Sequence, residues 1–118
     1  MGSRERVMRI AAGAGIAAAL ALFGLEAQAQ QTTLSVQIAV KQRRFEPAEV
    51  HVPPGRPILL SIRNFDGAAV EFESVSLRVE KVIAANGRGT IELRPLQPGR
   101  YKFFDDFHPE ARGTLVVR

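Results

Sequence analysis

The chain has 118 residues, a formal net charge of +4 and no cysteine. This length suits one domain, and the absence of cysteine excludes disulfide bonds and thiolate-ligated metal sites. Basic residues alternate with acidic ones and form no stripe with interleaved aromatic residues, so nucleic-acid binding is not expected.

The first segment has the pattern of a signal peptide. Arginines come first, an Ala- and Leu-rich stretch covers residues 10–25, and residues 27–29 spell A-x-A. We expect residues 1–29 to be removed and residues 30–118 to act as one domain in a periplasm. A permanent membrane anchor is the alternative, but a span needs about 20 strongly apolar residues, and this stretch is short and rich in Ala and Gly.

Short β patterns separated by turn residues fill the rest of the chain. The stretch 68–77 is the least regular, and no amphipathic helical pattern occurs after the leader. About seven strands at this spacing predict an all-β fold, an antiparallel Greek-key β-sandwich. Extended segments are predicted over 32–41, 50–52, 58–63, 78–83, 90–93, 101–104 and 114–118.

The C-terminal stretch 101–118, YKFFDDFHPEARGTLVVR, carries the clearest functional pattern. An aromatic strand is followed by a short polar loop and then by the closing strand, which Gly113 precedes. Rigid strands that flank a polar loop are one way in which a β-sandwich presents a metal site. The polar side chains of the predicted loop are Asp105, Asp106, His108 and Glu110.

This stretch resembles the C-terminal signature of the cupredoxins, in which a Y-x-F-x strand leads into Cys-x-x-His. Asp105 falls on the position of the ligand Cys, and His108 falls on that of the ligand His. The phrase that opens at Phe45, F-x-P-x-x-V-x-V-x-x-G, is also similar to the start of small cupredoxin-like domains. The resemblance implies a cupredoxin-like sandwich, but a blue-copper site is not expected without a thiolate and an axial Met.

Two phrases, EFESVSLRVEK at 71–81 and FFDDFHPEARGTL at 103–115, resemble the cupredoxin-like domain of periplasmic EfeO-type iron-uptake proteins. That resemblance implies a periplasmic metal-handling domain that serves iron or copper acquisition. It also implies a periplasmic or inner-membrane metal-uptake protein as partner.

We expect one ion, copper or iron, at the end of the sandwich. Carboxylates with one imidazole form a hard ligand set that suits Fe(III), Mn or Cu(II). By contrast, Glu80 is expected to pair with Lys81, and His51 to lie on a strand surface. The predicted metal ligands are Asp105 and His108, with Glu71 and Glu73 beside them, and Glu110.

Two other function classes stay open. An Asp-Asp pair in a loop is also typical of a solvated turn, so the chain could be a metal-free structural or interaction domain derived from a cupredoxin. A one-electron carrier is the third class. An enzyme is not expected, because the sequence has no nucleophile motif, no Gly-rich phosphate loop and no zinc-ligand spacing.

Overall fold

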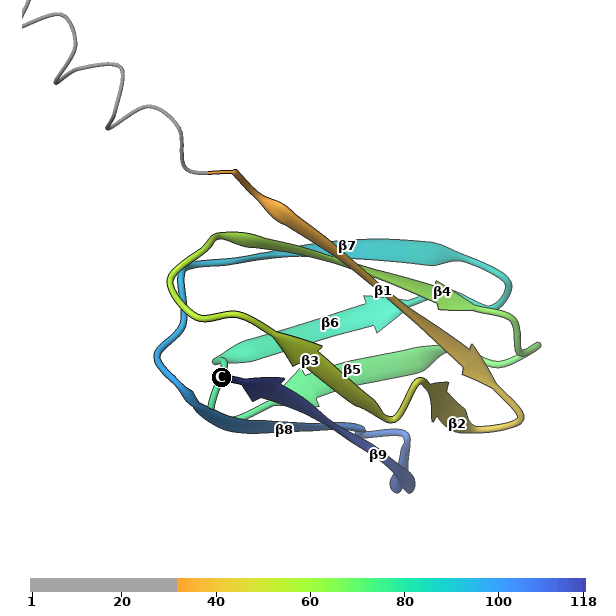
Figure 1. Cartoon of the computed structure of the whole chain (residues 1–118). Coiled ribbons are helices and arrows are strands. Elements are labelled where there is room, and N and C mark those ends of the chain that lie inside the picture. Colours follow the sequence, from red (N-terminus) through yellow and green to blue (C-terminus); the bar gives the residue numbers. More distant parts are fainter. Residues whose placement is uncertain (1–31) are drawn as a thin grey trace, which may run out of the picture. The chain divides into compact units, whose positions relative to one another are not determined.

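Thr32 to Arg118 form a two-layer β-sandwich of nine strands (Figure 1) in the computed structural model, which describes these residues. The predicted signal peptide, residues 1–29, lies outside them, so its cleavage stays a prediction. Within the described part, no helix is long and apolar enough to cross a membrane.

The two sheets have four and five strands. The four-stranded sheet has the order β2 (Arg44–Glu46), β1 (Leu34–Lys41), β4 (Ile58–Asn64) and β7 (Arg88–Leu93). The five-stranded sheet has the order β3 (Glu49–Val52), β9 (His108–Val117), β8 (Gly99–Asp105), β5 (Val70–Ser74) and β6 (Val79–Ile83).

The all-β sandwich is confirmed, with two differences from the prediction. The strand count exceeds seven because two strands were not predicted: β2, a short edge strand formed where the segment 44–52 passes from one sheet to the other, and β5, within the irregular stretch 68–77. The sandwich is also not wholly antiparallel, because β1 pairs with β4 and β3 pairs with β9 in the parallel sense.

The polar loop predicted after residue 104 is mostly strand. β8 extends to Asp105 and β9 begins at His108, so only Asp106 and Phe107 form the turn between them. The backbone N–H of Phe107 donates to the Asp105 carboxylate at 3.0 Å, which closes this turn locally. The candidate ligands on this hairpin are therefore held by paired strands.

Three aromatic rings fill the core between the sheets. Phe45 packs edge-on against Phe72 and Phe103, at centroid distances of 6.0 and 5.0 Å, and the latter two stack at 5.0 Å. All three are buried, and burial of such side chains supplies the main stabilising term of folding. Phe72 lies opposite Asp105 in the strand register, so this aromatic cluster positions the strands that carry the candidate site.

Candidate metal-binding site

Alternation along β5 gives its side chains two environments. Val70, Phe72 and Ser74 are buried, whereas Glu71 and Glu73, which alternate with them, are partly exposed on the outer face of the five-stranded sheet. The stretch that contained no clear sequence pattern thus includes a regular strand. The pattern was hard to recognise because the alternation of apolar residues with Glu71 and Glu73 covers only four residues before the polar Ser74.

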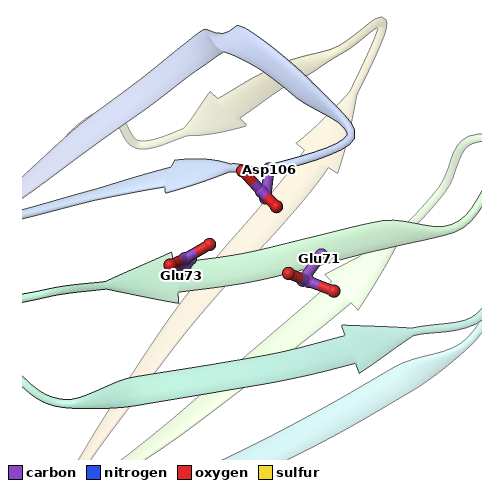
Figure 2. A group of neighbouring side chains, drawn as sticks. All are labelled: Glu71, Glu73 and Asp106. Carbon is purple, nitrogen blue, oxygen red and sulfur yellow. The ribbon is translucent and has the colours of Figure 1, made fainter.

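Asp106 joins the two glutamates from the β8–β9 turn. Its backbone N–H donates to the carbonyl oxygen of Glu71 at 2.9 Å, which ties the turn to β5. One carboxylate oxygen from each of Glu71, Glu73 and Asp106 lies within 4.8 Å of the other two. Figure 2 shows the two glutamates on one strand and Asp106 on the neighbouring hairpin. We call these three residues the outer carboxylate group.

Partial burial and crowded negative charge raise the pKa of both glutamates in this group. For Glu71, partial burial raises the pKa most, followed by a hydrogen bond with Glu80 and by repulsion from Glu80, Asp106 and Glu73. Partial burial and repulsion from Asp106 and Glu80 likewise raise the pKa of Glu73. Glu80 contributes because it lies directly opposite Glu73 on β6. A cation bound here would relieve this repulsion.

Asp105 and His108 form a separate pair on the inner side of the hairpin. Asp105 is 1% exposed, and its Oδ1 accepts hydrogen bonds from the backbone N–H groups of Glu71 and Phe107, both at 3.0 Å. Its Oδ2 lies 3.1 Å from Nδ1 of His108, whose side chain is 24% exposed. Asp105 therefore anchors backbone and imidazole groups, and a carboxylate of this kind can orient a metal-binding His.

A hollow of about 350 Å³ lies beside this pair. It is bounded by the β1–β2 turn, by the β4–β5 loop, and by Asp105 with His108. Asp66 fixes the turn, because its two carboxylate oxygens accept the backbone N–H groups of Gln42 and Arg43 at 2.8 and 2.9 Å. His108 is accordingly the only predicted ligand among the described residues that combines partial exposure with a place on this hollow.

The predicted ligands thus lie in two groups, not in one. Asp105 and His108 are together on the inner side, Glu71 and Glu73 are together on the outer face, and Glu110 is exposed on β9 outside the outer carboxylate group. Asp106 was recognised as a loop residue but not as a ligand. The sequence did contain one indication that Asp106 faces the outer side. It directly follows Asp105 at the end of a strand, where successive residues face opposite sides.

Two secondary expectations had different outcomes. His51 is exposed on β3, as expected, with Nε2 at 3.6 Å from Glu49. The predicted ion pair of Glu80 with Lys81 is wrong for the described structure, since neighbouring residues on a strand point to opposite faces and Glu80 contacts Glu71.

Residues 14–117 match the family model described as a cupredoxin-like domain. This chain therefore belongs to the cupredoxin-like domain family. One relative, the uncharacterized protein RP394 of Rickettsia prowazekii, is 41% identical over 85 residues, which are 71% of this chain and 68% of the relative.

Solved structures share the fold at low sequence identity. The metal-binding domain of the Cu(I)-exporting P-type ATPase CopA of Streptococcus pneumoniae, with Cu(I), is 14% identical, with a TM-score of 0.65 and coverage of 75% of this chain and 98% of that one. A purple cupredoxin from Nitrosopumilus maritimus is 19% identical, with a TM-score of 0.55 and coverage of 70% and 99%. A Cu(I) amicyanin variant is also 19% identical, with a TM-score of 0.58 and coverage of 71% and 82%.

A blue-copper centre does not fit the residues present. The chain has no thiolate, and the carboxylate at the position of the cupredoxin Cys, Asp105, already binds two backbone N–H groups and His108. Such a centre requires two imidazole ligands, and among residues 32–118 His108 alone supplies one at this end of the sandwich. The outer carboxylate group offers instead an all-oxygen ligand set.

Proposed function

We propose that this domain is a periplasmic metal-binding module that takes part in iron or copper acquisition or delivery. The ion is held by Glu71, Glu73 and Asp106. The observation that carries the proposal is the convergence of three carboxylate oxygens within 4.8 Å of one another. Two of these residues were predicted as ligands from the sequence.

The chemistry of the group decides which ions it suits. Carboxylate oxygens are hard ligands, and Fe(III), Mn(II) and Cu(II) accept oxygen-rich coordination, whereas Cu(I) prefers sulfur. Raised pKa values of Glu71 and Glu73 add a pH dependence, because a proton and a cation compete for the same oxygens. Metal uptake should therefore strengthen as the pH rises above the ordinary glutamate pKa of 4.5 toward neutrality.

Partners and location follow from the same proposal. A small domain with a surface ion and no thiolate suits the transfer of metal to an uptake protein rather than electron transfer or catalysis. The signal-peptide pattern in residues 1–29 supports export to the periplasm. Ligation by Asp105, His108 and Glu110 stays a sequence prediction, which the experiment below separates from the outer carboxylate group.

One observation favours the alternative of a metal-free interaction domain. The buried carboxylate of Asp105 takes the position of the cupredoxin Cys and already accepts two backbone hydrogen bonds, a role that holds this end of the fold together through protein groups. Under this alternative, the outer carboxylate group is only a solvated acidic surface.

Thermal melting with and without metal separates the two functions. Free Cu(II) or chelate-buffered Fe(III) at a hundred times its dissociation constant should stabilise the protein by about 2.7 kcal/mol. The variants Glu73→Gln and Asp106→Asn should lose most of this gain, while Glu110→Gln and His108→Gln should retain it. Absence of metal-dependent stabilisation in the wild-type protein would establish the metal-free alternative.

A further inference from the structure

A second feature of the outer face lies beside the outer carboxylate group. It is a groove of about 890 Å³ between the turn that follows β5 and the β8–β9 hairpin. This size is within the range of sites that hold small organic molecules. Three basic and three apolar residues that line it are Arg100, Lys102, Arg112, Val75, Phe104 and Pro109.

The strand register places these side chains on one face. Arg100, Lys102 and Phe104 are alternate residues of β8, and Phe104 lies opposite Arg112 on β9. Alternate residues are about 7 Å apart along a strand, and Lys102 is a diagonal neighbour of Arg112 across the ladder, at a similar spacing. Lys102 and Arg112 therefore lie next to the apolar ring of Phe104, and Arg100 lies one step further along β8.

Two of the three cations of this groove have no ion pair within residues 32–118, although Glu73 borders the groove opposite Phe104. Glu49 also lines the groove, but it lies 3.4 Å from Arg100 and 3.6 Å from His51. Among Thr32 to Arg118, neither Lys102 nor Arg112 has a carboxylate oxygen within 4.0 Å. The guanidinium of Arg112 is held in place, because its Nε donates to the Pro109 carbonyl at 2.9 Å.

The groove also exposes apolar surface. Val75 is 79% exposed at one wall, and Phe104 at the centre is only partly buried. An apolar surface beside two unpaired cations, Lys102 and Arg112, is complementary to a molecule with an apolar body and a negative group at its edge. Inorganic anions would leave Phe104 and Val75 uncovered, and neutral apolar molecules would leave Lys102 and Arg112 without a partner.

We propose that this groove is a binding site for a small organic anion with an apolar body, such as an aromatic carboxylate or sulfonate. Lys102 and Arg112 bind its charged group, and Phe104 contacts its apolar part. The site is distinct from the outer carboxylate group, although the two meet where Phe104 lies opposite Glu73. The proposal does not rest on metal binding.

Fluorescence titration with two matched probes tests this site. The anionic probe is 8-anilinonaphthalene-1-sulfonate, and the uncharged probe is N-phenyl-1-naphthylamine, which has the same aromatic body. The metal-free wild-type protein should bind the anionic probe saturably, one per chain, and at least tenfold more tightly than the uncharged one. Lys102→Gln and Arg112→Gln should each weaken the anionic probe several-fold and leave the uncharged one unchanged.

Control variants and an alternative occupant complete the test. Arg88→Gln removes an exposed cation from β7 of the other sheet and should leave both affinities unchanged. The proposal is overturned if the two probes bind equally, if the anionic probe is insensitive to Lys102 and Arg112, or if no saturable binding occurs. It is also overturned if sedimentation shows a dimer that Lys102→Gln dissociates, because a second copy would then fill the groove.

Discussion

Asp105 and Asp106 are neighbours in sequence but have different surroundings. The Asp105 side chain is buried and accepts hydrogen bonds from two backbone N–H groups. The Asp106 side chain is exposed beside Glu71 and Glu73. Because strand ends direct alternate residues to opposite faces, one carboxylate supports the fold and the other is available to an ion.

Asp105→Ala should destabilise the metal-free protein by about 3 kcal/mol, because it leaves two backbone N–H groups and the His108 imidazole without their partner in a largely buried site. Asp106→Ala is the matched control and should change stability by less than about 0.5 kcal/mol. Urea unfolding of both variants provides the measurement. Equal losses of stability would show that Asp105 does not have this anchoring role.

The repulsion among the outer carboxylates has a pH signature. A raised pKa means that folded Glu71 retains its proton at a pH where the unfolded chain, with an ordinary value of 4.5, has lost it. Stability therefore falls as the pH rises through this window. Without metal, Glu71→Gln should melt at a higher temperature than the wild type at pH 7, and the difference should shrink toward pH 4.

Melting curves from pH 4 to pH 7.5 give this difference directly. Glu92→Gln, an exposed position on β7 of the other sheet, serves as the control for the loss of one charge. A constant difference across the pH range, or a less stable Glu71→Gln at pH 7, would contradict the description of this group.

At the scale of elements, the β8–β9 hairpin connects the core to both candidate sites. Its inner face carries Phe103 and Asp105, and its outer face carries Phe104 and Arg112. Gly113 lies opposite Phe103, and a Cβ atom there would overlap the Phe103 ring and lie 2.8 Å from the carbonyl oxygen of Ala48. The cupredoxin-like motif has a glycine at this position, and the close packing of Phe103 and Ala48 explains why a side chain does not fit there.

Gly113→Ala should destabilise the protein by about 1–3 kcal/mol, because the added methyl group forces the aromatic cluster to move. Gly67→Ala is the control, since a Cβ atom at Gly67 meets nothing within 4 Å. Chemical denaturation of the two variants measures the difference. A neutral Gly113→Ala would mean that the Phe103 ring has room that the structure does not show.

The sequence predicted the elements best where apolar residues alternate regularly. The patterns of β1 and β4 identified these strands within two residues, because one face of each is apolar. The extent of β9 was not predictable, because His108, Pro109 and Glu110 have no strand pattern. His108 is held by pairing with Asp105, and Pro109 and Glu110 lie in an irregular part of the ladder before Arg112 pairs with Phe104. Pairing between distant segments is not encoded in local periodicity.

At the scale of the whole molecule, the fold class followed from the spacing of turns and from the cupredoxin-like motifs. The separation of the candidate ligands into an inner pair and an outer group did not follow from the sequence. The side that each ligand faces depends on the bounds of β5 and on where β8 ends, and neither the short strand β5 nor the turn at Asp106 was predicted. Residues that lie on opposite faces of the five-stranded sheet were consequently predicted to form one site.

The whole molecule also limits the kind of copper site that it can form. Without cysteine in its 118 residues, the protein cannot give the intense sulfur-to-copper absorption of a blue site. Added Cu(II) is nevertheless a useful probe, because its electron spin reports the nuclei of its ligands. The outer carboxylate group has only oxygen ligands, whereas the alternative site contains the imidazole of His108.

Pulsed electron paramagnetic resonance of the protein with one equivalent of Cu(II) therefore tests the central claim most directly. We predict oxygen-only coordination, with no imidazole nitrogen modulation in the wild type and loss of the bound signal in Asp106→Asn. Imidazole modulation that disappears in His108→Gln and persists in Asp106→Asn would place the ion at Asp105 and His108 and contradict the account.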